Sequence, residues 1–118
     1  MSALPAAHRG DIWVVDWSPA RGSEQAGLRP AVVVQTDAAN LNLGYPNVIV
    51  VTVSTRGRAV PFHVPVEPSA ENRLRSTSYV KCEQVLTIAK DRLTRRIGQL
   101  SAADLARVVA ALKLVLEM

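Results

Sequence analysis

The stretch Asn47–Ser54 limits the possible folds more than any other part of the sequence. It reads Asn-Val-Ile-Val-Val-Thr-Val-Ser, and β-branched residues fill its whole interior. Such residues favour an extended backbone, because their stiff side chains pack well on a pleated surface. The run shows no alternation of apolar and polar residues, which indicates a strand with both faces buried. We therefore predict a central strand here, with other strands on either side.

Weaker strand signals lie before and after this run. The segments are 11–17, 28–36, 60–66 and 79–88, and residues 93–100 form a short strand or turn. Pro61 and Pro65 cannot donate backbone hydrogen bonds, which confines 60–66 to a sheet edge or a bulge. The segments 37–46 and 67–78 carry the Asn, Pro and Ser of exposed loops.

The C-terminal segment carries the clearest helix signal. Ser101 is a suitable N-cap and meets Asp104 three residues later, a capping box with aspartate in place of glutamate. The apolar residues that follow at helical spacing are Leu105, Val108, Val109, Leu112 and Leu116. They predict one apolar stripe that packs on a core or on a partner.

Short consecutive strands closed by one helix define the expected fold class. It is mainly β with a C-terminal helix, α+β by content, arranged as a small barrel or curled antiparallel sheet. Hydrophobic residues make up 48% and charged residues 20% of the 118 residues, as in a soluble globular protein. We expect a single domain over 1–118, in which residues 1–8 are a loose tail.

Composition excludes several classes of protein. No run approaches the roughly 20 apolar residues that cross a bilayer, so no membrane span is expected. Cys82 is the only cysteine, which rules out an internal disulfide and a cysteine-based zinc site and makes a cytoplasmic location the expectation. The net charge of +4 and the sequence pI of 9.8 mildly favour an anionic partner.

A polar loop, Arg21-Gly-Ser-Glu-Gln-Ala-Gly27, separates the first two strands, and Arg29 follows it. Loops carried by rigid strands often hold binding and catalytic residues. His8 and His63 lack partners at metal-ligand spacing, so no metal site and no cofactor are predicted. The remaining polar candidates are Glu24, Gln25, Arg29, Ser54, Thr55, Arg56 and Arg58. Arginines and hydroxyls can bind a phosphate and stabilise charge on it, which permits RNA cleavage without a metal but does not select it.

The sequence resembles the MazF/PemK (Kid) toxins of bacterial toxin–antitoxin pairs over roughly residues 9 to 116. The matching segments are Arg9-Gly-Asp-Ile-Trp-Val-Val-Asp16, Ser18-Pro, Gly22-Ser-Glu-Gln-Ala-Gly27, Arg29-Pro-Ala-Val-Val-Val34, Val50-Val-Thr-Val-Ser-Thr55, Glu83-Gln-Val85, Thr87-Ile88, Arg92-Leu93, Ile97-Gly-Gln-Leu100 and the closing helix. The loop from Gly22 to Pro30 is long and specific, and all segments occur in the expected order.

This resemblance implies a homodimeric, single-domain endoribonuclease with an SH3-like barrel that cuts single-stranded RNA at short sequences without a metal. It also implies inhibition by a cognate MazE-like antitoxin protein. The family's catalytic arginine falls on Arg29 and its catalytic threonine on Ser54. The residues that the resemblance assigns to substrate contacts are Glu24, Gln25, Asn40, Thr55, Arg56 and Gln84.

Two departures from the family pattern and two other functions stay open. Ser54 replaces the usual threonine and is followed by Thr55, so either hydroxyl is a candidate for the site. Leu86 stands where many relatives carry a basic residue. A gyrase-poisoning toxin on the same barrel would typically carry a tryptophan near the C-terminus, where this chain ends Leu114-Val-Leu-Glu-Met118. A non-catalytic RNA-binding module is the third possibility, although an aromatic content of 4% disfavours base stacking.

Overall fold

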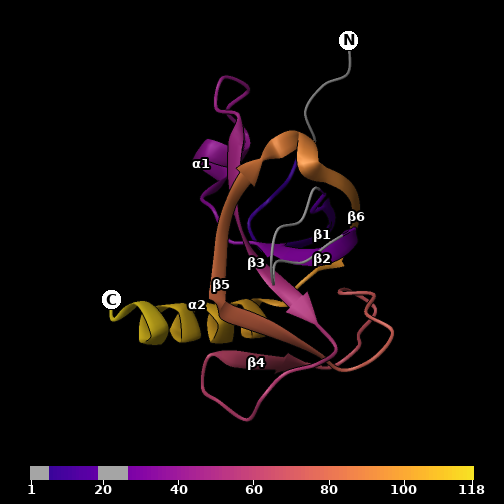
Figure 1. The fold of residues 1–118 in the computed structure, drawn as a ribbon, viewed down its shortest axis with the longest axis vertical. Coiled ribbons are helices and arrows are strands. Elements are labelled where there is room, and N and C mark those ends of the chain that lie inside the picture. Colours follow the sequence, from indigo (N-terminus) through magenta and orange to yellow (C-terminus); the bar gives the residue numbers. More distant parts are fainter. Residues whose placement is uncertain (1–5, 19–26) are drawn as a thin grey trace.

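The computed structural model describes residues 6–18 and 27–118. Within these residues six strands form one antiparallel sheet in the order β4-β5-β3-β2-β1-β6. The strands are β1 (Asp11–Asp16), β2 (Leu28–Val33), β3 (Asn47–Ser54), β4 (His63–Val66), β5 (Ser78–Ala89) and β6 (Leu93–Gln99). The sheet curls strongly, and helix α2 (Ala102–Leu116) crosses behind β5 (Figure 1). The predicted mainly β class with a C-terminal helix is confirmed.

The central position of β3 follows from its apolar interior. Val48 and Val50 belong to a core cluster with Trp13, whereas Val51 and Val53 belong to a second cluster with Val108 of α2. Because neighbouring residues of a strand point to opposite faces, β3 contributes to both cores at once. The prediction that Asn47–Ser54 is buried on both faces is confirmed.

The other strands differ from the sequence predictions mainly at their ends. β2 stops at Val33, and the expected loop over 37–46 begins with a short helix, α1 (Asp37–Asn40). Thr36 caps this helix by accepting a hydrogen bond from the backbone N–H of Ala38. β4 begins at His63, after Pro61, and lies at a sheet edge, as Pro65 within it requires. A short 3₁₀ turn, η1 (Lys90–Arg92), leads into β6, which is a full strand rather than a turn.

Helix α2 begins where the sequence predicts. The side chain of Ser101 accepts a hydrogen bond of 3.1 Å from the backbone N–H of Asp104, so the N-cap is confirmed. Leu116, the last residue of the predicted stripe, is 53% exposed and does not pack on the core of this chain. The helix extends past β5 toward the C-terminus (Figure 1), and it packs on the core through Leu105, Val108, Ala111, Leu112 and Val115.

The N-terminal segment is also better packed than expected. Ala7 is only 3% exposed and belongs to the core cluster of Trp13. The backbone N–H of Arg9 donates to Asp37 Oδ1 at 2.7 Å, which joins this segment to α1. The prediction of a loose tail over residues 1–8 is therefore wrong at Ala7, and residues 1–5 lie outside the described part.

Candidate active site

Strands β2 and β3 bring Arg29 and Ser54 to one face of the sheet. Their register pairs Ala31 with Thr52 and Val32 with Val51. Since alternate residues of a strand share a face, Arg29 and Ala31 lie on the same face as Thr52 and Ser54. The same register continued by two residues sets Arg29 level with Ser54, at the end where β3 stops. Arg29 is exposed and Ser54 is half-buried, which suits groups that meet a substrate.

The backbone of Arg29 is held by the neighbouring strand β1. Arg29 pairs with Val15, and the Trp17 indole Nε1–H donates to the carbonyl oxygen of Arg29 at 3.3 Å. The backbone N–H of Trp17 also donates to the carbonyl of Gly27 at 2.9 Å. Gly27 has φ of +71°, a backbone conformation that glycine adopts without strain as the chain enters β2. Glu24 and Gln25 lie outside the described residues.

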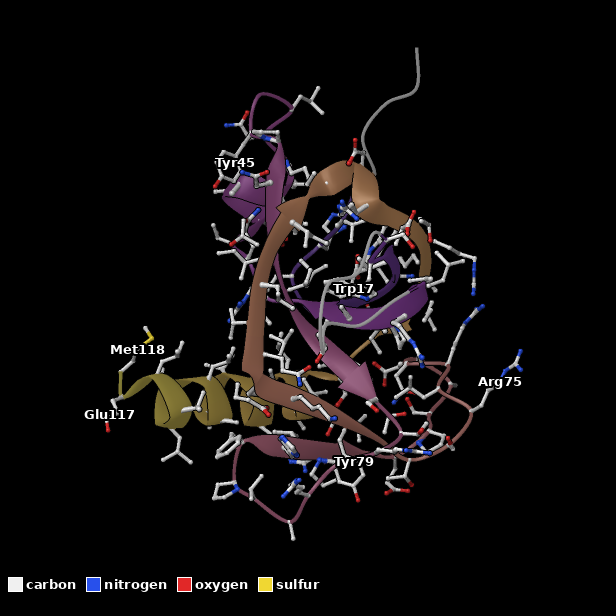
Figure 2. All side chains as sticks on the ribbon, in the orientation of Figure 1. Trp17, Tyr45, Arg75, Tyr79, Glu117 and Met118 are labelled. Carbon is white, nitrogen blue, oxygen red and sulfur yellow. The ribbon has the colours of Figure 1, made fainter. Side chains whose placement is uncertain are left out.

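The guanidinium of Arg92 reinforces the same region from η1. Its Nη1 donates to the carbonyl oxygen of Asp16 at 2.9 Å and to that of Ser18. These carbonyls belong to the residues on either side of Trp17, so the contacts hold the backbone before and after it. Figure 2 shows Trp17 beside the ribbon of β1 and β2. Arg92, together with Trp17, is a part of the site that sequence reasoning missed, since nothing in its spacing separates it from the nearby basic residues.

Ser54 ends β3 with a hydroxyl that already accepts one hydrogen bond. The backbone N–H of Arg56 donates to Ser54 Oγ at 3.1 Å, which turns the chain out of the strand. The hydroxyl hydrogen can still be donated, because a serine oxygen both accepts and donates. Thr55 and Arg56 follow on the exposed turn. This end of β3 therefore gathers two hydroxyls and an arginine close to the level of Arg29.

The turn after Ser54 is fixed by a buried histidine on β4. The backbone N–H of Arg58 donates to His63 Nδ1 at 3.0 Å, and the opposite ring nitrogen lies 2.9 Å from Glu83 Oε2. Because Nδ1 accepts, Nε2 carries the proton and donates to the carboxylate. His63 is 8% exposed, so its role is to hold the loop that carries Thr55 and Arg56.

Gln84 joins the site through β5, whereas Asn40 does not. The Thr52 hydroxyl donates to Gln84 Oε1, which ties Gln84 to the same face as Ser54. Asn40 is 4% exposed, and its amide donates to the carbonyl of Gln35 at 2.9 Å and to Asp37 Oδ1 at 3.0 Å. Gln35 in turn binds the carbonyl of Asn47, at the other end of β3.

The two ends of β3 are far apart. Its eight residues span roughly 23 Å at about 3.3 Å per residue. Figure 2 shows the same separation, with Tyr45 beside α1 and Tyr79, the partner of Ser54, at the opposite end. The structure thus brings Arg29, Ser54, Thr55, Arg56 and Gln84 to one end of the sheet and holds Asn40 in a hydrogen-bonded network at the other.

Other reactive features lie apart from this end of the sheet. Burial raises the pKa of the Cys82 thiol to about 11, and the negative charge of Glu83 adds to the effect, so the thiolate is scarce at neutral pH. A shallow hollow of about 380 Å³ lies between β4 and α2, and its lining includes neither Arg29 nor Ser54. In the described part of the chain, no three histidine, cysteine or acidic side chains gather where they could hold a metal ion.

Comparison with known proteins places the chain in a family. The fold is a small curled β-sheet of six strands with a C-terminal helix. Its candidate site is polar and lies at the end of β3, where Arg29 and Ser54 are on adjacent strands. The model of the PemK-like, MazF-like toxins of type II toxin–antitoxin systems matches residues 8–116. This chain belongs to that family.

Individual relatives agree with this assignment. Endoribonuclease MazF9 of Mycobacterium tuberculosis is 43% identical over 114 residues, which covers 93% of this chain and 96% of that protein. A crystal structure of MazF from Deinococcus radiodurans superposes with a TM-score of 0.76 at 26% identity, covering 97% and 99% of the two chains. A mycobacterial endoribonuclease in complex with its cognate antitoxin gives a TM-score of 0.79 at 24% identity, covering 96% and 97%.

Proposed function

We propose that this protein is a toxin endoribonuclease that cuts single-stranded RNA at short sequences and needs no metal ion. The observation that carries the proposal is the register of β2 and β3, which pairs Ala31 with Thr52 and, continued by two residues, sets Arg29 level with Ser54, in a chain that belongs to the PemK-like, MazF-like toxins. A 43% identical relative named as an endoribonuclease supports the reaction class.

The chemistry follows from RNA and from these two side chains. The 2′-oxygen of the substrate attacks the adjacent phosphorus, the new O2′–P bond forms, and the P–O5′ bond breaks. The 2′-hydroxyl loses its proton, the departing 5′-oxygen gains one, and the products are a cyclic phosphate and a 5′-hydroxyl. The negative charge that builds on the phosphorane oxygens is stabilised by the planar guanidinium of Arg29. Arg29 also takes part in the proton transfer.

Ser54 and the neighbouring residues bind the phosphate and the RNA. The Ser54 hydroxyl donates its hydrogen to a phosphate oxygen, because that oxygen can only accept, and the N–H of Arg56 holds Ser54 Oγ in place. Thr55, Arg56 and Gln84 contact the RNA on either side of the scissile phosphate. Glu24 and Gln25, which lie outside the described residues, complete the binding loop by resemblance, and Asn40 enters the proposal only as a support for α1.

The proposal extends to partners and location. We propose that the chain acts as one domain in a cytoplasmic homodimer and that a MazE-like antitoxin inhibits it. The solved complex of a mycobacterial endoribonuclease with its cognate antitoxin supports the antitoxin assignment. None of the helices in the described residues has the length and apolar character needed to span a membrane.

The test is cleavage of a long single-stranded RNA by the purified protein in excess EDTA. We expect cuts at one short repeated sequence, none with Arg29→Ala, and a rate lower by roughly 100- to 1,000-fold with Ser54→Ala, as for loss of a positioned donor. Arg107→Ala is the matched control, because Arg107 lies on α2 and pairs with Asp104. Cleavage that requires magnesium would overturn the mechanism, and a larger loss with Thr55→Ala than with Ser54→Ala would transfer the role to Thr55.

A further inference from the structure

Strand β5 carries a large bulge opposite the middle of β3. Thr52 pairs with Lys81, but the preceding residue, Val51, pairs with Val85. Three residues of β5, Cys82–Gln84, therefore have no partner in the β3 register. A bulge bends a strand and directs its side chains to new positions, and bulges are frequent beside active sites. Figure 1 shows the sharp bend of β5 that accompanies it.

Each residue of the bulge makes a specific contact. The backbone N–H of Cys82 donates to the carbonyl of Phe62 at 2.9 Å, and its side chain is fully buried. Glu83 binds His63, which holds the turn after Ser54. Gln84 accepts the hydroxyl hydrogen of Thr52. The bulge thus links the core, the turn after β3 and the Ser54 face of the sheet.

The Thr52 contact fixes which way the Gln84 amide points. Thr52 is 1% exposed and its side chain is β-branched, so the hydroxyl has little freedom to move. The contact joins two oxygen atoms, and only the threonine oxygen carries a hydrogen, so Thr52 is the donor and the amide oxygen is the acceptor. The opposite end of the amide, Nε2 with its two hydrogens, then points away from Thr52. Among the described residues no hydrogen-bond acceptor contacts this group.

Thr52 and Gln84 lie close to the proposed cleavage site, so the orientation of the Gln84 amide can affect which RNA is bound. Thr52 lies two residues before Ser54 on the same face of β3, directly opposite Ala31 of β2. The Gln84 amide therefore lies on the strand next to β3 and contacts a residue only two positions from Ser54, at the proposed cleavage site. Single-stranded RNA is read by hydrogen bonds to the edges of its unstacked bases. A fixed Nε2–H₂ group offers donors to such an edge.

We infer that Thr52 is a positioning residue that directs the Gln84 side-chain amide to read hydrogen-bond acceptors on a base beside the scissile phosphate. The inference rests on the proposed ribonuclease function. At this position of the substrate the protein favours a base edge that presents only acceptors to the amide, such as O6 and N7 of guanine or O4 of uracil. The N4 amino group of cytosine or the N6 amino group of adenine in the same place would face the Nε2–H₂ donors with another donor, and is disfavoured.

The experiment compares how the wild type and the variants cleave a pool of single-stranded RNAs randomised around the cut site. Sequencing of the cleaved ends gives the relative kcat/KM of substrates with each base at each position. Thr52→Val removes the hydroxyl while keeping the shape of the side chain. We expect the preference for acceptor-bearing bases at one position to fall by roughly 2- to 10-fold, the effect of losing one fixed hydrogen bond. Thr52→Ser should retain the preference. Thr87→Val, at an exposed threonine of β5, the strand that carries Gln84, is the matched control and should leave the profile unchanged.

A second variant tests the direction of the amide. Gln84→Glu still accepts from Thr52 through one carboxylate oxygen and presents the other as an acceptor, so the preference should turn toward bases with amino groups. If thermal denaturation shows that Thr52→Val is folded and its base-preference profile is identical to that of the wild type, the inference alone is overturned. A wild type that cuts no RNA overturns the proposed function, and the inference with it. If Thr52→Val does not fold, Gln84→Ala decides, and an unchanged base preference in that variant refutes the inference.

Discussion

Replacement of Arg92 by alanine tests how the site is assembled. The Arg92 guanidinium bridges the carbonyls of Asp16 and Ser18. Trp17, between these carbonyls, in turn binds the carbonyl of Arg29. Hydrogen bonds at both ends of the Asp16–Ser18 segment thus connect η1, through the backbone and side chain of Trp17, to the backbone of the proposed catalytic residue. Arg92→Ala removes the first member of the series and leaves the sequence of β1 and β2 unchanged.

The size of the effect follows from the two lost hydrogen bonds. Hydrogen bonds from a charged group contribute about 1.5–3 kcal/mol each when buried. The contact with Asp16 is half-buried and that with Ser18 is exposed, so the lower end applies and the exposed bond adds little. We expect the free energy of unfolding to fall by about 2 kcal/mol. With a urea m-value of about 2 kcal/mol/M for a small domain, the midpoint shifts by about 1 M.

Loss of the Arg92 hydrogen bonds should also lower the rate of RNA cleavage. Freed from Arg92, Trp17 and Arg29 can shift, and a misplacement of about 1 Å at a reacting group can cost about 100-fold in rate. We expect kcat/KM for RNA cleavage to fall by roughly 10- to 100-fold while the variant remains folded. Arg92→Lys keeps the charge but not the fork that reaches two carbonyls, so it should fall between the wild type and Arg92→Ala.

The assay is urea denaturation followed by tryptophan fluorescence, combined with RNA cleavage below the unfolding transition. Trp13 is 8% exposed, so quenching by acrylamide in the folded state reports mainly on Trp17 and should increase in the variant. Arg95→Ala, at an exposed arginine of β6 three residues away, controls for the loss of one positive charge. An Arg92→Ala variant that matches this control in urea midpoint, quenching and cleavage would refute the reasoning.

Two further predictions concern the supports of the sheet. Gly98→Ala should lower the free energy of unfolding by about 1–3 kcal/mol, because the new Cβ would lie 2.4 Å from the backbone oxygen of Glu71; an unchanged urea midpoint would contradict this packing. The backbone N–H of Arg9, and then the amide of Asn40, lower the pKa of Asp37 from its usual value of 3.8. The charged form therefore stabilises the fold at neutral pH, and this stability is lost as the pH falls through the folded-state pKa. Asp37→Asn should be less stable than the wild type at neutral pH, with a difference that shrinks in acid, whereas a pH-independent difference in urea midpoint would argue against the assignment.

Local patterns in the sequence were sufficient for the main elements. The β-branched interior of Asn47–Ser54 defines a central strand, Pro65 places β4 at an edge, and Ser101 starts the helix. Each of these features depends on the residues of one segment, through side-chain stiffness, a missing N–H or a cap. The resemblance to a toxin family likewise rests on local motifs, and Arg29 and Ser54 were assigned from it.

The arrangement of the site depended on contacts between distant segments. Arg92 and Asp16 are 76 residues apart, and Thr52 and Gln84 are 32 residues apart. Such pairs arise from strand register and from the β5 bulge, which no local pattern encodes, because each segment can form its strand in more than one register. The same reason explains why the position of Asn40 was not predicted. Its polar side chain is compatible with an RNA groove and with a buried hydrogen-bond network, and only the position of α1 in the fold distinguishes the two. The sequence by itself determined which segments are strands and which residues are candidates for the chemistry, and only the tertiary structure decided which of those residues meet.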